Sequence, residues 1–230
     1  MNRTLTVARM QFVAWRTVVG WPWGILALSF LINLALFGAI GEEDFEPTTG
    51  GLMSIYVVMF VASISAITMD FPFAMGLGVS RRSFYLGNVL HFVAQAVSYA
   101  AVLYLLAVIE EATDGWGMNL RFFGIPFLMV ENPILRYLGF AIPFLLLGFL
   151  GIAIAVVFKR WGMNGMLTLS AAALVGLGGA AVLITWQGWW SAIVGWFADQ
   201  PGGAILVGWP ALLTLPLAVI SYLIIRRATP

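Results

Sequence analysis

The sequence predicts an all-α integral membrane protein with six transmembrane helices, and three observations support this fold class. The 230 residues are 62% hydrophobic and only 9% charged, whereas soluble domains are about 25% charged. Six apolar runs each hold about the 20 residues that a helix needs to cross a hydrocarbon core of roughly 30 Å. Basic residues gather in alternate connections between these runs. Residues 1–230 are therefore expected to form a single transmembrane domain.

The six expected spans take up most of the chain. They cover residues 22–40, 52–69, 88–109, 137–158, 163–185 and 204–225. Residues 2–20 precede the first span and are predicted to form an interfacial helix, because Asn2, Arg9 and Arg16 are spaced seven apart and share one face. No small-residue cleavage pattern follows the first run, so we expect no signal peptide.

The distribution of charge predicts the orientation in the membrane. Nine of the 11 Lys and Arg residues lie in the N-terminal segment, in the connections after the second and fourth runs, or after the sixth run. Basic residues favour the cytoplasmic side, so both termini are expected to be cytoplasmic. The expected location is the cell membrane of a bacterium, which the chain crosses several times.

Several functions are disfavoured by composition and by missing motifs. The net charge of +1 offers no basic surface for a nucleic acid. Cysteine is absent and there is one histidine, so neither a thiolate metal site nor the H-E-x-x-H pair of a metalloprotease is present. The single lysine is not part of a phosphate-binding G-x-x-x-x-G-K-[ST] loop. The chain is therefore not expected to be an enzyme or to hold a cofactor or metal.

The histidine belongs to a polar stripe in the third predicted span. Asn88, His91 and Gln95 follow one another at i, i+3 and i+7, and therefore share one helix face. Hydrogen bonding within a helix bundle explains such a face as well as a translocation path does. Both interpretations stay open at this point.

Two outer connections contain apolar patches too short to span. Residues 110–136 include Phe122, Phe123 and Phe127, which are expected to lie in the interface or to fold back onto protein, because irregular backbone is not tolerated in lipid. Residues 187–203 predict a short interfacial helix and turn, an outer hairpin marked by Trp189, Trp190 and Trp196.

Small residues mark two helix faces that are suited to close packing. Gly148, Gly151 and Ala155 share a face of the fourth span, and Ala172, Gly176 and Ala180 repeat every four residues in the fifth. Packing within the monomer is the favoured interpretation for both, and a dimer seam is the alternative.

The inner connection from Asp70 to Gly87 carries the most specific local signals. Asp70 is expected to cap a helix with Pro72 just inside it, glycines at 76 and 78 permit a turn, and Ser80 is expected to cap the next helix. Two short helical pieces joined by this turn form a rigid projection. The candidate coupling residues in it are Asp70, Phe71, Phe73, Leu77, Ser80, Arg81 and Arg82.

A six-span chain with the sequence F-P-F-A-M-G-L-G-V-S-R-R-S-F-Y-L-G in its first inner connection resembles the permease subunits of ABC-2 type transporters. The resemblance implies a connection that docks on a separate ATP-binding cassette ATPase, which holds ATP and magnesium, and a second copy or paralogue of the permease. It implies an exporter, and because no charged residue lies in the middle of any predicted span, the expected substrate is amphipathic or apolar. Two alternatives remain: an intramembrane enzyme acting on lipid or peptide with His91 as its base, and a membrane assembly factor.

Overall fold

The structure is a computed structural model that describes residues 15–40, 49–124 and 131–227. The described residues fold into helices and contain no strand. The α-helices are α2 (Trp15–Ile40), α3 (Met53–Ser65), α4 (Phe71–Gly76), α5 (Arg81–Ala112), α6 (Pro133–Gln187), α7 (Trp190–Ala198) and α8 (Trp209–Ile225). The described residues also include two single turns of π-helix, η1 (Ala66–Asp70) and η4 (Ala204–Gly208), and the turn η2 (Gly115–Asn119), in which Trp116, Gly117 and Met118 have non-helical φ/ψ angles.

Five helical segments of the described residues are long and apolar enough to cross a membrane. They cover Val19–Ala39, Met53–Gly76, Arg81–Ala112, Pro133–Gln187 and Ala204–Ile225. The predicted class, an all-α protein with membrane-spanning helices, agrees with this arrangement. The predicted interfacial helix over residues 2–20 lies mostly outside the described residues, and its last part is wrong as a separate element, because the chain already belongs to α2 from Trp15.

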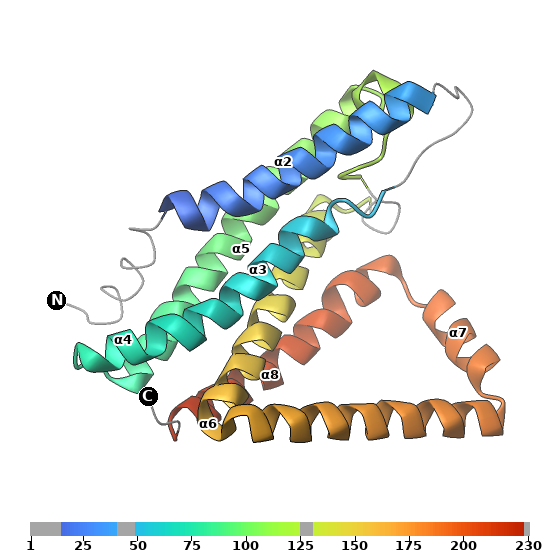
Figure 1. Cartoon of the computed structure of the whole chain (residues 1–230). Helices are drawn as coiled ribbons and strands as arrows, with labels where there is room; N and C mark the ends of the chain where they lie inside the picture. Colours follow the sequence, from blue (N-terminus) through green and yellow to red (C-terminus); the bar gives the residue numbers. More distant parts are fainter. Residues whose placement is uncertain (1–14, 41–48, 125–130, 228–230) are drawn as a thin grey trace.

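The core lies where α3 and α5 pack against the first half of α6, with α2 against α3 and α8 against α6 (Figure 1). Tyr56 of α3 stacks on Phe144 of α6 with ring centroids 4.2 Å apart, and its hydroxyl donates to the carbonyl of Phe140 at 3.2 Å. Aromatic pairs add stabilisation beyond their buried area. These contacts fix the position of α3 along the axis of α6.

The small-residue face of the fourth predicted span packs within the monomer, as predicted. Gly148, Gly151 and Ala155 are all buried. A Cβ atom added at Gly151 would overlap the hydroxyl of Ser63 and lie 2.8 Å from the carbonyl oxygen of Phe60. Glycine at this position therefore lets the backbones of α3 and α6 approach closely.

The fourth and fifth predicted spans follow one another directly, and the backbone changes direction at Gly162, between the predicted bounds at residues 158 and 163. Both lie within α6, whose 55 residues are interrupted only at Gly162, with φ 62° and ψ −152°. An uninterrupted helix of that length would extend roughly 80 Å, far beyond a hydrocarbon core of about 30 Å. Figure 1 shows the sharp change of direction that divides α6 into a first half, before Gly162, and a second half after it.

The second half of α6 extends away from the bundle, and α7 connects it back towards α8 (Figure 1). Ala172, Gly176 and Ala180 are exposed, and a Cβ atom added at Gly176 would meet nothing within 4 Å. The expectation that this small-residue face packs within the monomer is therefore wrong. The face has no partner among the described residues of this chain.

Candidate functional site

The connection between α3 and α5, residues 70–83, is here called the inner elbow. Helical backbone continues from α3 through η1 into α4, and Asp70 itself is helical, with φ −81° and ψ −27° and no side-chain cap hydrogen bond. The predicted Asp70 cap is wrong because a cap residue requires a helix that begins there. The π-turn η1 directly precedes α4, where Pro72 brings no backbone N–H of its own.

The turn that closes the inner elbow follows the sequence prediction. Gly78 takes the left-handed conformation, with φ 74°, and its N–H donates to the carbonyl of Met75 at 3.0 Å. Ser80 has extended backbone, and its hydroxyl oxygen accepts from the N–H of Ser83 at 3.2 Å. The Ser80 cap is thereby confirmed, and α5 begins immediately after it.

Two contacts fix the inner elbow to the bundle. The ring of Phe71 is fully buried and lies 5.3 Å from that of Phe84 in an edge-on contact. The Nη1 of Arg81 donates to the carbonyl oxygen of Arg226 at 2.9 Å, beyond the last residue of α8. This bond gives a partner to one of the terminal carbonyls that a helix end leaves unpaired. The elbow is consequently attached to both α5 and α8.

The opposite face of the inner elbow points away from the core. Phe73 is 60% exposed and Leu77 is 59% exposed, one turn apart. Arg82, the second residue of α5, is also exposed. Aromatic residues and arginine are enriched at the centres of protein interfaces, so exposed Phe73 and Arg82 make the inner elbow a candidate docking surface.

The polar stripe of α5 faces inward, as its spacing predicts. Asn88, His91 and Gln95 are all buried, and the side-chain amide of Asn88 donates to the carbonyl of Phe84 at 3.0 Å. His91 and Gln95 line a cavity of about 330 Å³ between α2, α3 and α5, whereas Asn88 does not. The remaining lining residues are Trp21, Pro22, Val58, Val61, Ala62, Ser65, Ala66, Met69, Asp70 and Phe92.

Sequence reasoning missed the importance of Glu110 at the far end of α5. Its carboxylate is buried and accepts four N–H groups: those of Phe122 at 3.0 Å, Phe123 at 3.0 Å and Gly124 at 2.6 Å, and the indole of Trp116 at 3.0 Å. Backbone donors to an ionised carboxylate form strong, short hydrogen bonds. Glu110 therefore attaches the outer connection to α5. We call Glu110 and its four N–H donors the outer clasp.

The outer connection folds back onto protein, which is the second of the two arrangements expected from the sequence. Phe122 and Phe123 are buried and form a cluster with Phe30 of α2, at 5.3 Å and 5.6 Å between ring centroids. The rings thus cover the space between α2 and α5 at this end of the bundle. The predicted Phe127 lies outside the described residues.

The outer hairpin contains the predicted short helix, α7. Trp189, Trp190 and Trp196 are all about half exposed. The indole of Trp190 donates to the hydroxyl of Thr185 at 3.0 Å, and Trp196 lies 5.5 Å from Trp209 at the start of α8. These contacts hold α7 between the second half of α6 and α8.

The described residues contain no group of three or more His, Cys, Asp or Glu side chains placed to hold a metal ion. Comparisons with protein-family models, with curated proteins and with solved structures give no match.

Proposed function

We propose that this chain is the transmembrane permease subunit of an ATP-binding cassette exporter. In this proposal each half of α6 crosses the membrane once, which gives six spans, and both termini are cytoplasmic. A separate ATPase subunit supplies ATP and magnesium. The cell membrane of a bacterium is the proposed location.

The observation that carries the proposal is the inner elbow. It presents Phe73 and Leu77 outward while Phe71 and Arg81 attach it to the bundle. A projection that is exposed on one face and rigidly held on the other transmits force from a docked partner to the helices behind it. Charge-assisted pairs of Arg82 with carboxylates of the ATPase favour correct docking.

The connections of the elbow define a mechanism with two states. Closure of two ATPase subunits on ATP displaces the elbow, and the continuous helical backbone from α4 into α3 carries this displacement into the bundle. The bond from Arg81 to the Arg226 carbonyl carries it to α8 as well. A rigid-body tilt of this kind alternates access between the two sides of the membrane.

The cavity between α2, α3 and α5 supports an amphipathic or apolar substrate. Valine, alanine, methionine and aromatic side chains form most of its walls, and polar groups of His91, Gln95 and Asp70 interrupt them. Ligand sites with apolar walls and a few polar groups use the walls for affinity and the polar groups for orientation.

The unpartnered second half of α6 supports a dimer of permease subunits. Leu174, Val175 and Leu177 are each more than 70% exposed, and small residues on this segment allow another helix to approach closely. We propose that a second copy or a paralogue of this chain packs there.

Capture of the partner ATPase from the native membrane tests the proposal. The Phe73→Ala/Leu77→Ala variant removes both exposed apolar anchors of the elbow and is expected to lower ATPase capture at least about tenfold. The matched control, Leu105→Ala/Ile109→Ala, removes exposed side chains from the other end of α5. Equal capture by both variants, with normal insertion, contradicts a coupling role for the elbow, and capture of no ATPase at all favours an assembly factor.

A second candidate function, the intramembrane enzyme, has one observation in its favour. Ser65, Asp70 and His91 line the same cavity. The hydroxyl of Ser65, however, donates to the carbonyl of Val61 at 3.1 Å. His91→Ala separates the two functions: the exporter retains ATPase capture and the ATP turnover of the captured ATPase, whereas an enzyme that uses His91 as its base loses turnover of its own substrate.

A further inference from the structure

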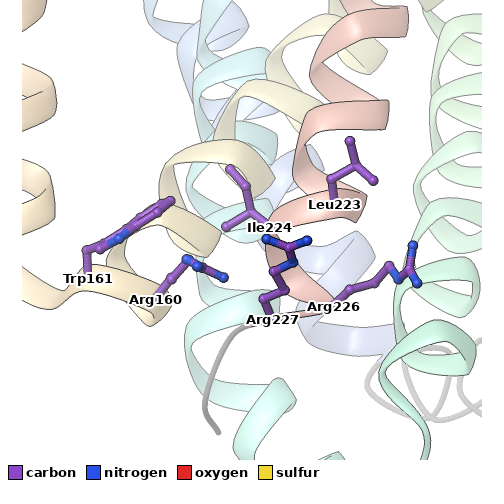
Figure 2. Close-up of a pocket in the computed structure, with 6 residues that line it drawn as sticks. All are labelled: Arg160, Trp161, Leu223, Ile224, Arg226 and Arg227. Atoms are coloured by element: carbon purple, nitrogen blue, oxygen red, sulfur yellow. The ribbon is translucent and has the colours of Figure 1, made fainter.

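The ends of the first half of α6 and of α8 enclose a basic pocket of about 470 Å³ (Figure 2). It lies at the same end of the bundle as α4 and the inner elbow (Figure 1). The residues that line it are Arg160, Trp161, Leu223, Ile224, Arg226 and Arg227. We call it the arginine pocket.

The three guanidinium groups of the arginine pocket form no ion pair with a carboxylate of the described residues. The ion pair in the described part of the chain joins Arg136 and Glu111, which lie elsewhere. Arg160 lies over the ring of Trp161 at 4.8 Å, which leaves the edge of its guanidinium open to an acceptor. In Figure 2 the side chains of Arg160 and Arg227 both extend into the space between the helices, while Arg226 points to the other side. Like charges held together in this way favour a bound anion.

The neighbouring side chains indicate what kind of anion fits. Arg226 and Arg227 directly follow the apolar helix α8, so they stand at the border of the hydrocarbon layer, where lipid headgroups lie. Leu223 and Trp161 are about half exposed beside them and offer an apolar surface to an acyl chain. A soluble acidic partner would reach only the polar side of this border, whereas a phospholipid occupies both sides.

We propose that the arginine pocket binds the phosphate of an anionic phospholipid, with Arg160 and Arg227 as its principal ligands. Guanidinium groups bind phosphate oxygens through paired N–H donors. Basic pockets between transmembrane helices are suited to acidic headgroups, whereas the ammonium group of a zwitterionic headgroup would be repelled by the three arginines. The bound lipid joins the kink of α6 to the end of α8, and Arg226 links α8 to the inner elbow.

Lipid binding to the purified chain alone, measured by native mass spectrometry in detergent, tests this proposal without the ATPase. The probes are dioleoyl phosphatidylglycerol and dioleoyl phosphatidylcholine. Arg160→Gln/Arg227→Gln is expected to raise the dissociation constant for phosphatidylglycerol roughly 10- to 30-fold. The control Arg82→Gln/Lys159→Gln removes the same net charge outside the pocket and is expected to stay within about twofold of the unmodified chain.

A further pair, Arg160→Lys/Arg227→Lys, keeps the charge and loses the guanidinium forks, so an intermediate loss is expected even if the glutamine pair does not fold. Four results overturn the proposal. They are equal binding of the two lipids, equal losses in the two glutamine pairs, displacement of the lipid by excess inorganic phosphate, and loss of ATPase capture by the arginine variant with lipid binding unchanged. The third result assigns the site to free phosphate and the fourth to a protein interface.

Discussion

The outer clasp offers the sharpest test of the structure. Replacing Glu110 by glutamine changes a buried carboxylate with four N–H donors around it into an amide with one acceptor oxygen. The new side-chain NH₂ group is itself a donor, so it cannot accept a hydrogen bond from the backbone N–H groups that it faces. The substitution keeps the size of the side chain almost unchanged, so its effect reports on hydrogen bonding.

The magnitude follows from the number of bonds lost. One amide oxygen can retain about two of the four donors, so two charge-assisted hydrogen bonds disappear, each contributing about 1.5–3 kcal/mol. Glu110→Gln is therefore expected to lower the free energy of unfolding by roughly 3–6 kcal/mol. The neighbouring Glu111 is 55% exposed and pairs with Arg136 at 2.8 Å. Glu111→Gln is expected to cost less, about 1–2 kcal/mol, because the amide oxygen still accepts from the Arg136 side chain, which is 12% exposed, and only one charge-assisted pair is weakened.

Denaturant unfolding in detergent, followed by tryptophan fluorescence, measures both variants under the same conditions. Hydrogen exchange at residues 120–124 adds a local measurement, since the amides of Phe122, Phe123 and Gly124 lose their acceptor in the Glu110 variant. If Glu110→Gln and Glu111→Gln unfold at the same denaturant concentration with the same exchange, the outer clasp does not hold the connection.

Two further predictions concern topology and the outer hairpin. The native chain has no cysteine, so a cysteine at Asp114 is expected to react with an impermeant reagent in intact cells, and one at Ser83 is not. Labelling at Ser83 and not at Asp114 means that the orientation is inverted, and equal labelling of the two sites contradicts the proposed topology. Trp190→Ala/Trp196→Ala removes the contacts to Thr185 and Trp209 and is expected to change transport while ATPase capture stays intact, whereas unchanged transport reduces these rings to interfacial anchors.

The parts of the fold that the sequence predicted are those governed by local composition and local hydrogen bonding. The long apolar runs became helices because nothing within them competes with the backbone ladder. The Ser80 cap was predictable because it depends on a hydroxyl and an N–H three residues apart. Asp70 carries the same kind of signal, but the helix that precedes it continues through the position, so no free N–H groups remain to be capped.

The parts that depend on tertiary packing were not predictable from one sequence. Phe71 and Phe73 are two residues apart on α4, yet one is buried and the other is exposed, because α5 covers only one face of this short helix. Glu110 and Glu111 are adjacent and look equivalent in the sequence. Only the return of the outer connection to the end of α5 places four donors around the first of them. The arginine pocket likewise joins residues more than 60 positions apart.

The kink of α6 connects the fold to the proposed topology, and it rests on one residue. Gly162, with φ 62° and ψ −152°, occupies a backbone region open essentially to glycine alone. Gly162→Ala is expected to cost about 1–3 kcal/mol of stability or to straighten the helix. A straight α6 would carry Asp199 away from the outer side that the six-span proposal assigns to it, so a cysteine there should lose its labelling in intact cells. Gly20→Ala is the matched control, since this glycine of α2 has open space around it and alanine favours the helix. If Gly162→Ala unfolds and labels as the control does, the change of direction does not depend on glycine, and the division of α6 into two crossings loses its physical basis.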